Sequence, residues 1–95
     1  MLQALDPLQH SELRLAVMSL LISVDEADFV YLREKTGATA GNLSVQIDKL
    51  QQAGYISVAK GFDGKKPRTT CRVTDQGRTA FFAYYEAIKS YFPKK

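Results

Sequence analysis

The sequence predicts an α+β fold that is mainly helical: three helices, a β-hairpin and a last helix. Three observations support this prediction. Apolar residues recur at helical spacing in the first half of the chain, they alternate at strand spacing between residues 55 and 74, and helical spacing then returns. The length of 95 residues allows a single domain with one modest core.

The first helix is expected from Leu8 to about Ile22. It follows Asp6-Pro7, and proline is well tolerated at the start of a helix. The acidic residues 25–28 are expected to break it. Its apolar residues recur every three or four positions and form one broad stripe, which consists of Leu13, Ala16, Val17, Leu20 and Leu21.

A short second helix is predicted over residues 29–36. Gly37 is expected to end it, because glycine readily adopts the left-handed conformation that closes many helices. Thr39 suits the N-cap of a third helix over residues 40–53, since its hydroxyl can accept a hydrogen bond from a helix-start N–H. Two helices joined around a glycine form a helix-turn-helix, about residues 29–53. The buried face of the third helix is predicted to hold Leu43, Ile47 and Leu50.

A hairpin is predicted over about residues 55–74. Residues 55–60 and 68–74 alternate and are rich in residues that favour strands. The turn cluster between them contains Asp63-Gly64, a dipeptide typical of tight hairpin turns. The ribbon follows the helix-turn-helix directly, which is the element order of a winged helix-turn-helix.

The last helix is predicted over about residues 75–92, capped by Thr74 and ended by Pro93. It is rich in aromatic residues on two neighbouring stripes. One stripe is expected to cover this chain's own core and consists of Phe81, Tyr85, Ile88 and Phe92. The other is left over and includes Tyr84 and Tyr91.

Composition and charge limit the function. No apolar run approaches the ~20 residues that a membrane span needs, and the position and flanks of the longest run, residues 15–24, do not match a signal-peptide pattern. We therefore expect no membrane partner and a cytoplasmic location. The net charge of +3 is unevenly distributed, because residues 1–35 hold six acids and three bases whereas residues 36–73 hold two acids and six bases. The basic middle third suits a polyanion, although a solvated surface with chance asymmetry explains the same charge.

Catalytic and metal sites are not expected. The sequence shows no nucleophile–base pair, paired carboxylates or phosphate-binding loop, so an enzyme is set aside. His10 and Cys71 are the only soft metal ligands and are too scattered to form a metal site. Cys71 is expected in the core and His10 at a helix start or dimer contact. No cofactor is predicted.

Four segments together resemble a known group of proteins. They are residues 5–21 (LDPLQHSELRLAVMSLL), 28–44 (DFVYLREKTGATAGNLS), 47–62 (IDKLQQAGYISVAKGF) and 68–78 (RTTCRVTDQGR). The chain resembles the small single-domain winged-helix transcriptional regulators related to the MarR and ArsR families. The resemblance covers nearly the whole chain and implies a homodimer that places the third helix of each subunit in a DNA major groove. At position 40 such proteins often have an acidic or polar residue, and at position 46 often His, whereas this chain has Ala40 and Gln46.

The third helix carries the predicted DNA-reading residues. Small residues at its start let a surface come close, and free N–H groups there favour a phosphate. Polar residues on its outward side can hydrogen-bond with base edges. Packing on the second helix would also explain Gly41 and Asn42, and both interpretations stay open. Val45 is expected to pack, or to meet a thymine methyl. The predicted DNA contacts on this helix are Thr39, Ala40, Gly41, Asn42, Ser44, Gln46 and Lys49.

The hairpin carries further predicted DNA contacts. Basic residues there would bind phosphates, and the tip could enter a minor groove. A solvated hairpin whose lysines discourage edge-to-edge association is the alternative. Arg72 could instead pair with an acid of the first helix. The predicted contacts are Lys60, Lys65, Lys66 and Arg68.

A two-fold dimer seam is predicted between the first and last helices, since exposed aromatic patches usually mark interfaces. Coverage of this chain's own core, or a ligand pocket between the two helices, would also explain the aromatic residues. The predicted seam residues are Leu13, Leu20, Leu21, Phe82, Tyr84 and Tyr91.

The leading hypothesis is a sequence-specific transcriptional regulator that binds double-stranded DNA, at an inverted repeat, as a homodimer. The second hypothesis is a winged-helix protein-interaction module with no specific DNA binding. The operator, the effector and the direction of regulation are not readable from the sequence.

Overall fold

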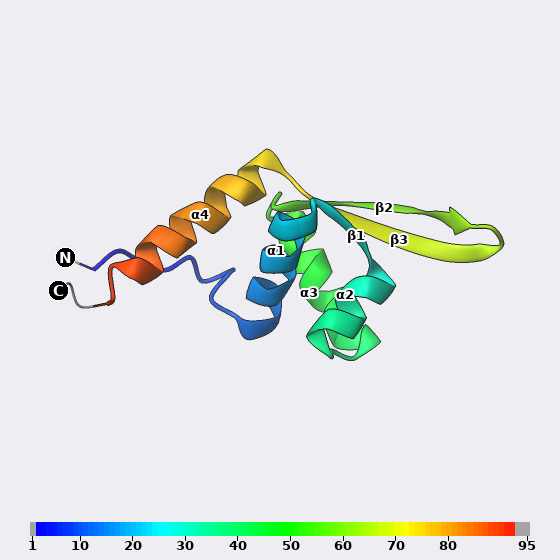
Figure 1. Cartoon of the computed structure of the whole chain (residues 1–95), viewed down its shortest axis with the longest axis horizontal. Helices are drawn as coiled ribbons and strands as arrows, with labels where there is room; N and C mark the ends of the chain where they lie inside the picture. Colours follow the sequence, from blue (N-terminus) through cyan, green and yellow to red (C-terminus); the bar gives the residue numbers. More distant parts are fainter. Residues whose placement is uncertain (1, 93–95) are drawn as a thin grey trace.

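Four helices and three strands make up the computed structural model, which describes residues 2–92 (Figure 1). This content confirms the mainly helical α+β prediction. The chain order is α1 (Glu12–Val24), β1 (Glu26–Asp28), α2 (Phe29–Thr36), α3 (Ala40–Gln52), β2 (Ile56–Asp63), β3 (Lys66–Val73) and α4 (Asp75–Lys89).

The elements are spread along one long axis, and the molecule measures 55 × 25 × 21 Å. Helices α1, α2 and α3 gather in the middle, the β2–β3 hairpin projects to one side and α4 projects to the other (Figure 1). The strands form one antiparallel sheet in the order β1-β3-β2. The hairpin tip and the far end of α4 therefore lie at opposite ends of the molecule.

The helix-turn-helix agrees closely with the prediction. Helix α2 ends at Gly37, which has the expected left-handed conformation with φ 72°. The Thr39 hydroxyl accepts a hydrogen bond from the Asn42 N–H at 3.2 Å and so caps α3. A cap that the sequence analysis missed lies at the start of α2, where an Asp28 carboxylate oxygen accepts from the Tyr31 N–H at 2.8 Å.

The first helix starts later than predicted, at Glu12 and not at Leu8. Residues before it form a turn around Asp6, whose carbonyl accepts from the His10 N–H at 2.9 Å and whose carboxylate accepts from the Leu8 N–H at 3.0 Å. The fully buried Gln9 donates to the Ala80 carbonyl of α4 at 2.9 Å. These bonds hold the segment against α4 and keep it out of the helical path.

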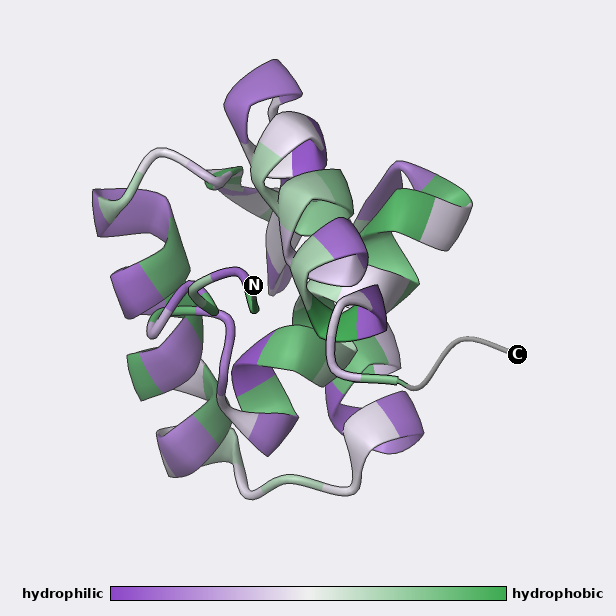
Figure 2. Ribbon diagram, turned by 90° about the vertical axis from the view of Figure 1, so that its left-hand side faces the viewer, coloured by the Kyte–Doolittle hydropathy of each residue, from purple (hydrophilic) through white to green (hydrophobic). Residues whose placement is uncertain are grey.

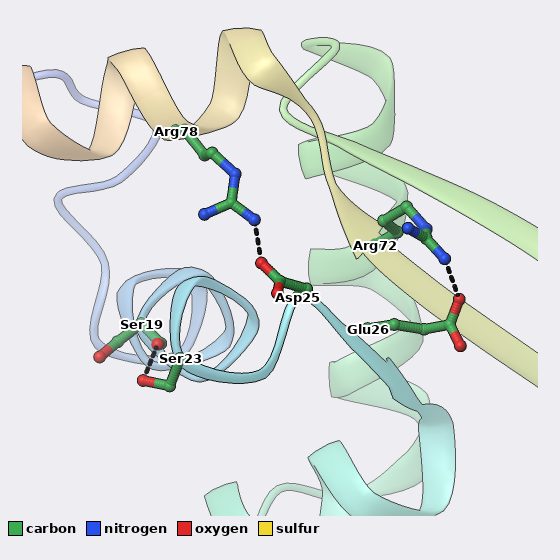
Figure 3. Close-up of polar contacts among 6 residues, drawn as sticks. All are labelled: Ser19, Ser23, Asp25, Glu26, Arg72 and Arg78. Carbon is green, nitrogen blue, oxygen red and sulfur yellow. Dashed lines mark hydrogen bonds and ion pairs between the residues drawn. The ribbon is translucent and has the colours of Figure 1, made fainter.

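The acidic segment 25–28, predicted as a break, contains strand β1, which the sequence analysis did not predict. Asp25 has a φ of 68°, uncommon for a residue with a side chain, and turns the chain out of α1. Glu26 then lies opposite Arg72 in the sheet, and their side chains form an ion pair at 2.6 Å (Figure 3). Arg72 thus pairs with an acid beyond α1, not within it, while Arg78 of α4 pairs with Asp25 (Figure 3).

The hairpin is longer than predicted, because β2 and β3 stay paired without a break from Ile56↔Val73 to Asp63↔Lys66. Only two residues, Gly64 and Lys65, connect the strands. Gly64 has φ 64°, and Lys65 is not among the residues with positive φ. A positive φ at only the first loop position is the pattern of a type II′ turn, which matches the twist of the strands.

The core lies between α1, the helix-turn-helix and the base of the sheet. As predicted, α3 buries Leu43, Ile47 and Leu50. Hydrophilic and hydrophobic residues alternate along the helices, as expected for helices with one buried side (Figure 2). Cys71 is fully buried, as predicted, and this burial raises the pKa of its thiol to about 11.

Helix α4 ends at Lys89, earlier than predicted, and Pro93 lies outside the described residues. Thr74 caps it as predicted, accepting from the Gly77 N–H at 2.9 Å. Gly77 lies so close to the start of β2 that a Cβ atom built on it would be 2.0 Å from the Tyr55 carbonyl oxygen. Only glycine fits this contact between α4 and the sheet.

The N-terminal segment lies along α4. The Gln3 N–H donates to Ser90 Oγ at 3.2 Å, and the Tyr91 hydroxyl donates to the Gln3 carbonyl at 3.0 Å. Nearer the core, the Tyr55 hydroxyl donates to Asp6 at 2.6 Å. Partial burial raises the pKa of Asp6, but hydrogen bonds from Tyr55, Gln9 and the Leu8 N–H outweigh it and lower the pKa below 3.8. The same bond to Asp6, together with burial, raises the pKa of Tyr55 to about 12.

Across residues 2–92 none of the helices combines the length and the apolar character that a membrane crossing requires.

Candidate nucleic-acid interface

The outward side of α3 carries small and polar side chains. With Leu43, Ile47 and Leu50 buried, the residues on the other side of the helix are exposed. Gly41 lies in its first turn, and a Cβ atom built there would meet no heavy atom within 4 Å. The packing explanation for Gly41 therefore finds no neighbour among the described residues. The exposed residues are Ala40, Gly41, Asn42, Ser44, Val45, Asp48 and Lys49.

Gln46 differs from its prediction, because it is half-buried on the side of α3 that faces α1. Its Oε1 accepts a hydrogen bond from Arg14 of α1, and its Nε2 donates to Asn42 Oδ1 at 3.0 Å. Both ends of the amide are therefore engaged within the chain. Asn42 is exposed, but its side-chain oxygen is committed to Gln46.

Val45 was underestimated by the sequence analysis, which favoured packing. It is 50% exposed and lies on the outward side, next to Gly41 one turn earlier. A helical wheel gives the same answer, since position 45 lies almost opposite the buried positions 43, 47 and 50. The Val45 side chain is therefore accessible on the outward side of α3 and does not pack against the core.

A groove joins α3 to the base of the hairpin. Ser44 and Asp48 of α3 line one wall, and Lys60 and Thr69 of the hairpin line the other, with Phe29 of α2 beside them. The outward side of α3 and one face of the ribbon thus form a continuous surface. Asp48 places one carboxylate on this surface, opposite Lys60.

The basic residues of the hairpin divide into two groups. Arg68 lies 3.2 Å from Asp28, and Arg72 pairs with Glu26, so both are held on β1. The Tyr31 N–H lowers the pKa of Asp28, burial raises it, and Arg68 lowers it further, so this carboxylate stays charged. Lys49, Lys60, Lys65 and Lys66 make no ion pair with any residue in the described range. Among the basic residues of α3 and the hairpin, these four lysines are the ones best able to bind an external anion.

A second candidate surface lies between α1 and α4. An apolar groove there is lined by Leu15, Ser19, Phe81, Tyr84, Tyr85 and Ile88. Phe82 of α4, and Tyr91 and Phe92 just beyond its end, are also exposed. Tyr85 was predicted to cover the core, yet it is 53% exposed and belongs to this surface.

Two predicted seam residues are not available to a second chain. Leu21 is fully buried in the core, and Tyr84 is only 6% exposed. The Tyr84 hydroxyl lies 2.9 Å from His10 Nδ1, because the N-terminal segment covers this side of α4. His10 therefore contacts Tyr84 of α4 within the chain. Leu13 and Leu20 are half-buried and pack against the core.

Comparison with known proteins gives a consistent result. The family model described as a winged helix DNA-binding domain matches residues 13–92. An uncharacterized protein of Methanocaldococcus jannaschii is 32% identical over 81 residues, which covers 84% of this chain and 88% of that protein. The winged-helix resemblance found in the sequence is thereby confirmed.

Solved structures share the fold. The transcriptional regulator homologue from Pyrococcus horikoshii OT3 superposes with a TM-score of 0.81 at 25% identity, over 87% of this chain and 82% of that one. A MarR-family regulator from Silicibacter pomeroyi gives a TM-score of 0.68 at 18% identity. NadR in complex with 4-hydroxyphenylacetate gives 0.73 at 17% identity. Each of these two superpositions covers 87% of this chain, but only 55% of the Silicibacter pomeroyi protein and 61% of NadR.

Proposed function

The chain belongs to the winged helix DNA-binding domain family, and we propose that it is a sequence-specific transcriptional regulator that binds duplex DNA as a homodimer. The observation that carries this proposal is the outward side of α3. It is exposed, slim around Gly41, and continuous with a lysine-bearing face of the hairpin. A regulator of this kind would act in the cytoplasm.

The size of α3 suits a major groove. The groove is about 12 Å wide and a helix with its side chains is about 10–12 Å across, so bulk on the leading side chains decides how deep the helix enters. Gly41 and Ala40 minimise that bulk at the helix start, where free N–H groups favour a phosphate. Ser44 then reaches base edges as a hydrogen-bonding group, and Val45 suits a thymine methyl.

Gln46 has a different role in this proposal from the one first predicted. Its bonds to Arg14 and Asn42 fix the α1 side of α3 and position the Asn42 side chain. Asn42 keeps its two amide hydrogens for a base edge or a phosphate. Sequence reading is therefore assigned to Asn42, Ser44 and Val45, with Gln46 as a positioning residue.

The lysines supply affinity without sequence preference. Each phosphate that a lysine neutralises releases counterions, so binding weakens steeply as salt increases. Lys49 of α3 and Lys60, Lys65 and Lys66 of the hairpin take this role. Arg68 joins them only by giving up Asp28, so its contribution is smaller.

The α1–α4 surface is proposed as the two-fold seam, revised to leave out Leu21 and Tyr84. Exposed aromatic side chains on α4 and the apolar groove beside them form an area that a second copy can cover. Two-fold symmetry then predicts an inverted repeat with half-sites about one helical turn apart. Leu13 and Leu20 are left out as well, because both pack against the core on the other flank of α1, where Leu13 lines a groove with Thr36, Ala38 and Asn42. The revised seam residues are Leu15, Phe82, Tyr85 and Tyr91.

The function is tested by selecting bound duplexes from a random pool at two salt concentrations. Enrichment of a short inverted repeat supports the proposal. The variant Ser44→Ala should change which bases are enriched, whereas Lys49→Ala should weaken binding to all duplexes alike. If nothing is enriched, and Lys49→Ala binds as the unmodified chain does, the winged-helix surface serves protein interaction and the proposal fails.

The seam is tested by sedimentation of the variant Tyr85→Glu. A charge in the centre of an apolar contact should convert the dimer into a monomer. The matched variant Val30→Glu on α2, at a similarly exposed apolar residue away from the seam, should leave the dimer intact. Identical sedimentation of all three proteins as dimers would place the seam elsewhere.

A further inference from the structure

Phe62 is the most exposed large hydrophobic residue in the described range, at 75%. It lies near the tip of the hairpin, far from the core and from the aromatic surface of α4 (Figure 1). Neither the fold nor the contacts assigned above use it. An exposed aromatic ring at the end of a β-hairpin also promotes unwanted association between sheets. Such a residue is therefore expected only where it contributes to binding.

The register of the hairpin shows which way Phe62 faces. Alternate residues of a strand point to the same side of the sheet, and pairing runs unbroken from Ile56 to Asp63. Ile56 is buried in the core, and Val58 and Lys60 line the groove beside α3. Phe62 continues this row, so it lies on the face of the ribbon that adjoins α3.

The cross-strand neighbours extend the same row. Pro67 lies opposite Phe62, and Thr69, which lines the groove, lies opposite Lys60. The row therefore ends in an apolar pair, Phe62 and Pro67, with Lys60 before it and Lys65 in the turn after it. Lys66 lies opposite Asp63 and so points to the other face of the ribbon. An apolar contact framed by cations matches a surface that is anionic and has an apolar part.

The minor groove of DNA is such a surface, because deoxyribose rings form its walls and phosphates form its rims. Proteins that enter this groove often place an apolar side chain such as Phe or Pro there. Phe62 lies two residues, about 7 Å, beyond Lys60. A helix has a radius of about 5 Å, and neighbouring major and minor grooves are centred about half a turn, roughly 17 Å, apart. With α3 in the major groove, Phe62 falls beyond the intervening phosphates.

We propose that Phe62, supported by Pro67, is an apolar contact that packs against the deoxyribose walls of the minor groove next to the site of α3. This inference rests on the proposed DNA binding and adds a second, uncharged source of affinity. It differs from the role of the lysines in one measurable way. Loss of Phe62 weakens binding without changing the number of released counterions, so the slope of affinity against salt stays the same.

The first experiment measures affinity for a mixed-sequence duplex of about 30 base pairs, roughly three helical turns, between about 50 and 200 mM NaCl. We expect Phe62→Ala to bind roughly tenfold more weakly at every salt concentration, with an unchanged slope. The double variant Phe62→Ala/Ala59→Phe moves the ring to the opposite face of the ribbon and should not restore affinity. Equal thermal midpoints for the variants show that the exposed ring contributes little to folding.

The second experiment uses the absence of tryptophan from the chain. The variant Phe62→Trp introduces a single fluorescent reporter on the α3 side of the ribbon, and Ala59→Trp places one on the other side. Addition of the duplex should protect the first reporter from acrylamide quenching and leave the second accessible. Such a difference locates the contact without relying on affinity.

The outcomes separate this inference from the proposed function. If the unmodified chain fails to bind the duplex even at low salt, the proposed function itself fails. If it binds, but Phe62→Ala binds equally well and both reporters stay accessible, the Phe62 contact is wrong and DNA binding stands. If Phe62→Ala alters the oligomeric state and not DNA affinity, the ring serves a protein contact and the inference is overturned.

Discussion

Helices α3 and α4 begin in the same way and serve different purposes. Each is capped by a threonine, Thr39 or Thr74, and each has a glycine in its first turn. At Gly77 an added Cβ atom would collide with the Tyr55 carbonyl at 2.0 Å, whereas at Gly41 it would meet nothing within 4 Å. The same local pattern thus closes an internal contact at the start of α4 and leaves the start of α3 open to solvent.

The difference shows that a glycine in a helix has to be explained by its surroundings. Glycine costs roughly 0.5–1 kcal/mol relative to alanine inside a helix, so the fold should use it only where something is gained. At Gly77 the gain lies inside the monomer, since α4 can approach the sheet. At Gly41 the monomer gains nothing, which is why a second molecule is invoked there.

The largest expected effect concerns Gly77, the packed glycine of the pair. Gly77→Ala places a methyl group against main-chain atoms that cannot move without shifting the sheet, and we expect the free energy of unfolding to fall by about 3 kcal/mol. Chemical denaturation measures it. A denaturation midpoint equal to that of the unmodified chain would mean that α4 does not pack on the start of β2.

The next largest effect concerns DNA binding by the hairpin lysines, which lie beside the exposed side of α3. The double variant Lys65→Ala/Lys66→Ala should weaken binding to all duplexes and reduce the slope of log affinity against log salt by about one for each lysine that contacts a phosphate. Arg68→Ala is the control, because Arg68 is already paired with Asp28. A larger loss from Arg68→Ala than from the double variant would reverse our assignment of the hairpin cations.

The third prediction concerns Tyr55, whose carbonyl contacts Gly77 and whose hydroxyl bonds to Asp6. Tyr55→Phe should lower the free energy of unfolding by about 1–2 kcal/mol at neutral pH, as expected for a hydrogen bond to a charged group. The pKa of Asp6 is lowered in the folded chain, so this contribution is present above pH 3.8 and is lost as the pH falls below it.

The pH dependence of unfolding for both proteins measures this effect. Their stabilities should converge below pH 3.8, where Asp6 takes up a proton. They should converge again between pH 10, where Tyr55 ionises in the unfolded chain, and about pH 12, where it ionises in the folded chain. A difference between the two proteins that persists unchanged at low pH would show that the Asp6 charge has no part in holding the N-terminal segment.

The smallest effect in free energy gives the sharpest contrast. Gly41→Ala should raise the free energy of unfolding by about 0.5–1 kcal/mol, because alanine favours the helix and the site is open. If α3 enters a major groove at this point, the same variant should bind DNA more weakly. Denaturation and duplex binding on one preparation measure both quantities, and greater stability with unchanged DNA affinity would remove Gly41 from the interface.

Much of the fold could be predicted because its signals are local. The caps Thr39 and Thr74, the left-handed Gly37 and the turn at Gly64 each depend on residues within one turn of the chain. The buried positions of α3 follow from its spacing alone. In contrast, β1 has only three residues and is stabilised by pairing with β3, more than forty positions later. No local sequence pattern therefore predicts it.

The candidate site was predicted less completely for a related reason. Gln46 faces α1 because its side chain is hydrogen-bonded to Arg14, and Tyr84 is covered because His10 packs against its hydroxyl. Both partners come from the beginning of the chain, whose path depends on the turn at Asp6 and on the buried Gln9. Spacing along one helix shows which residues share a face, but the neighbour that covers the face is set by tertiary structure.

The contact of Gln3 with Ser90 and Tyr91 has a practical consequence. It brings both ends of the described chain to the outer end of α4, away from the hairpin along the 55 Å axis (Figure 1). A fluorescent label, an affinity tag or a fused protein joined at either terminus would be carried on the side remote from Gly64. Engineers can therefore extend this scaffold at both ends while the ribbon and α3 stay unobstructed.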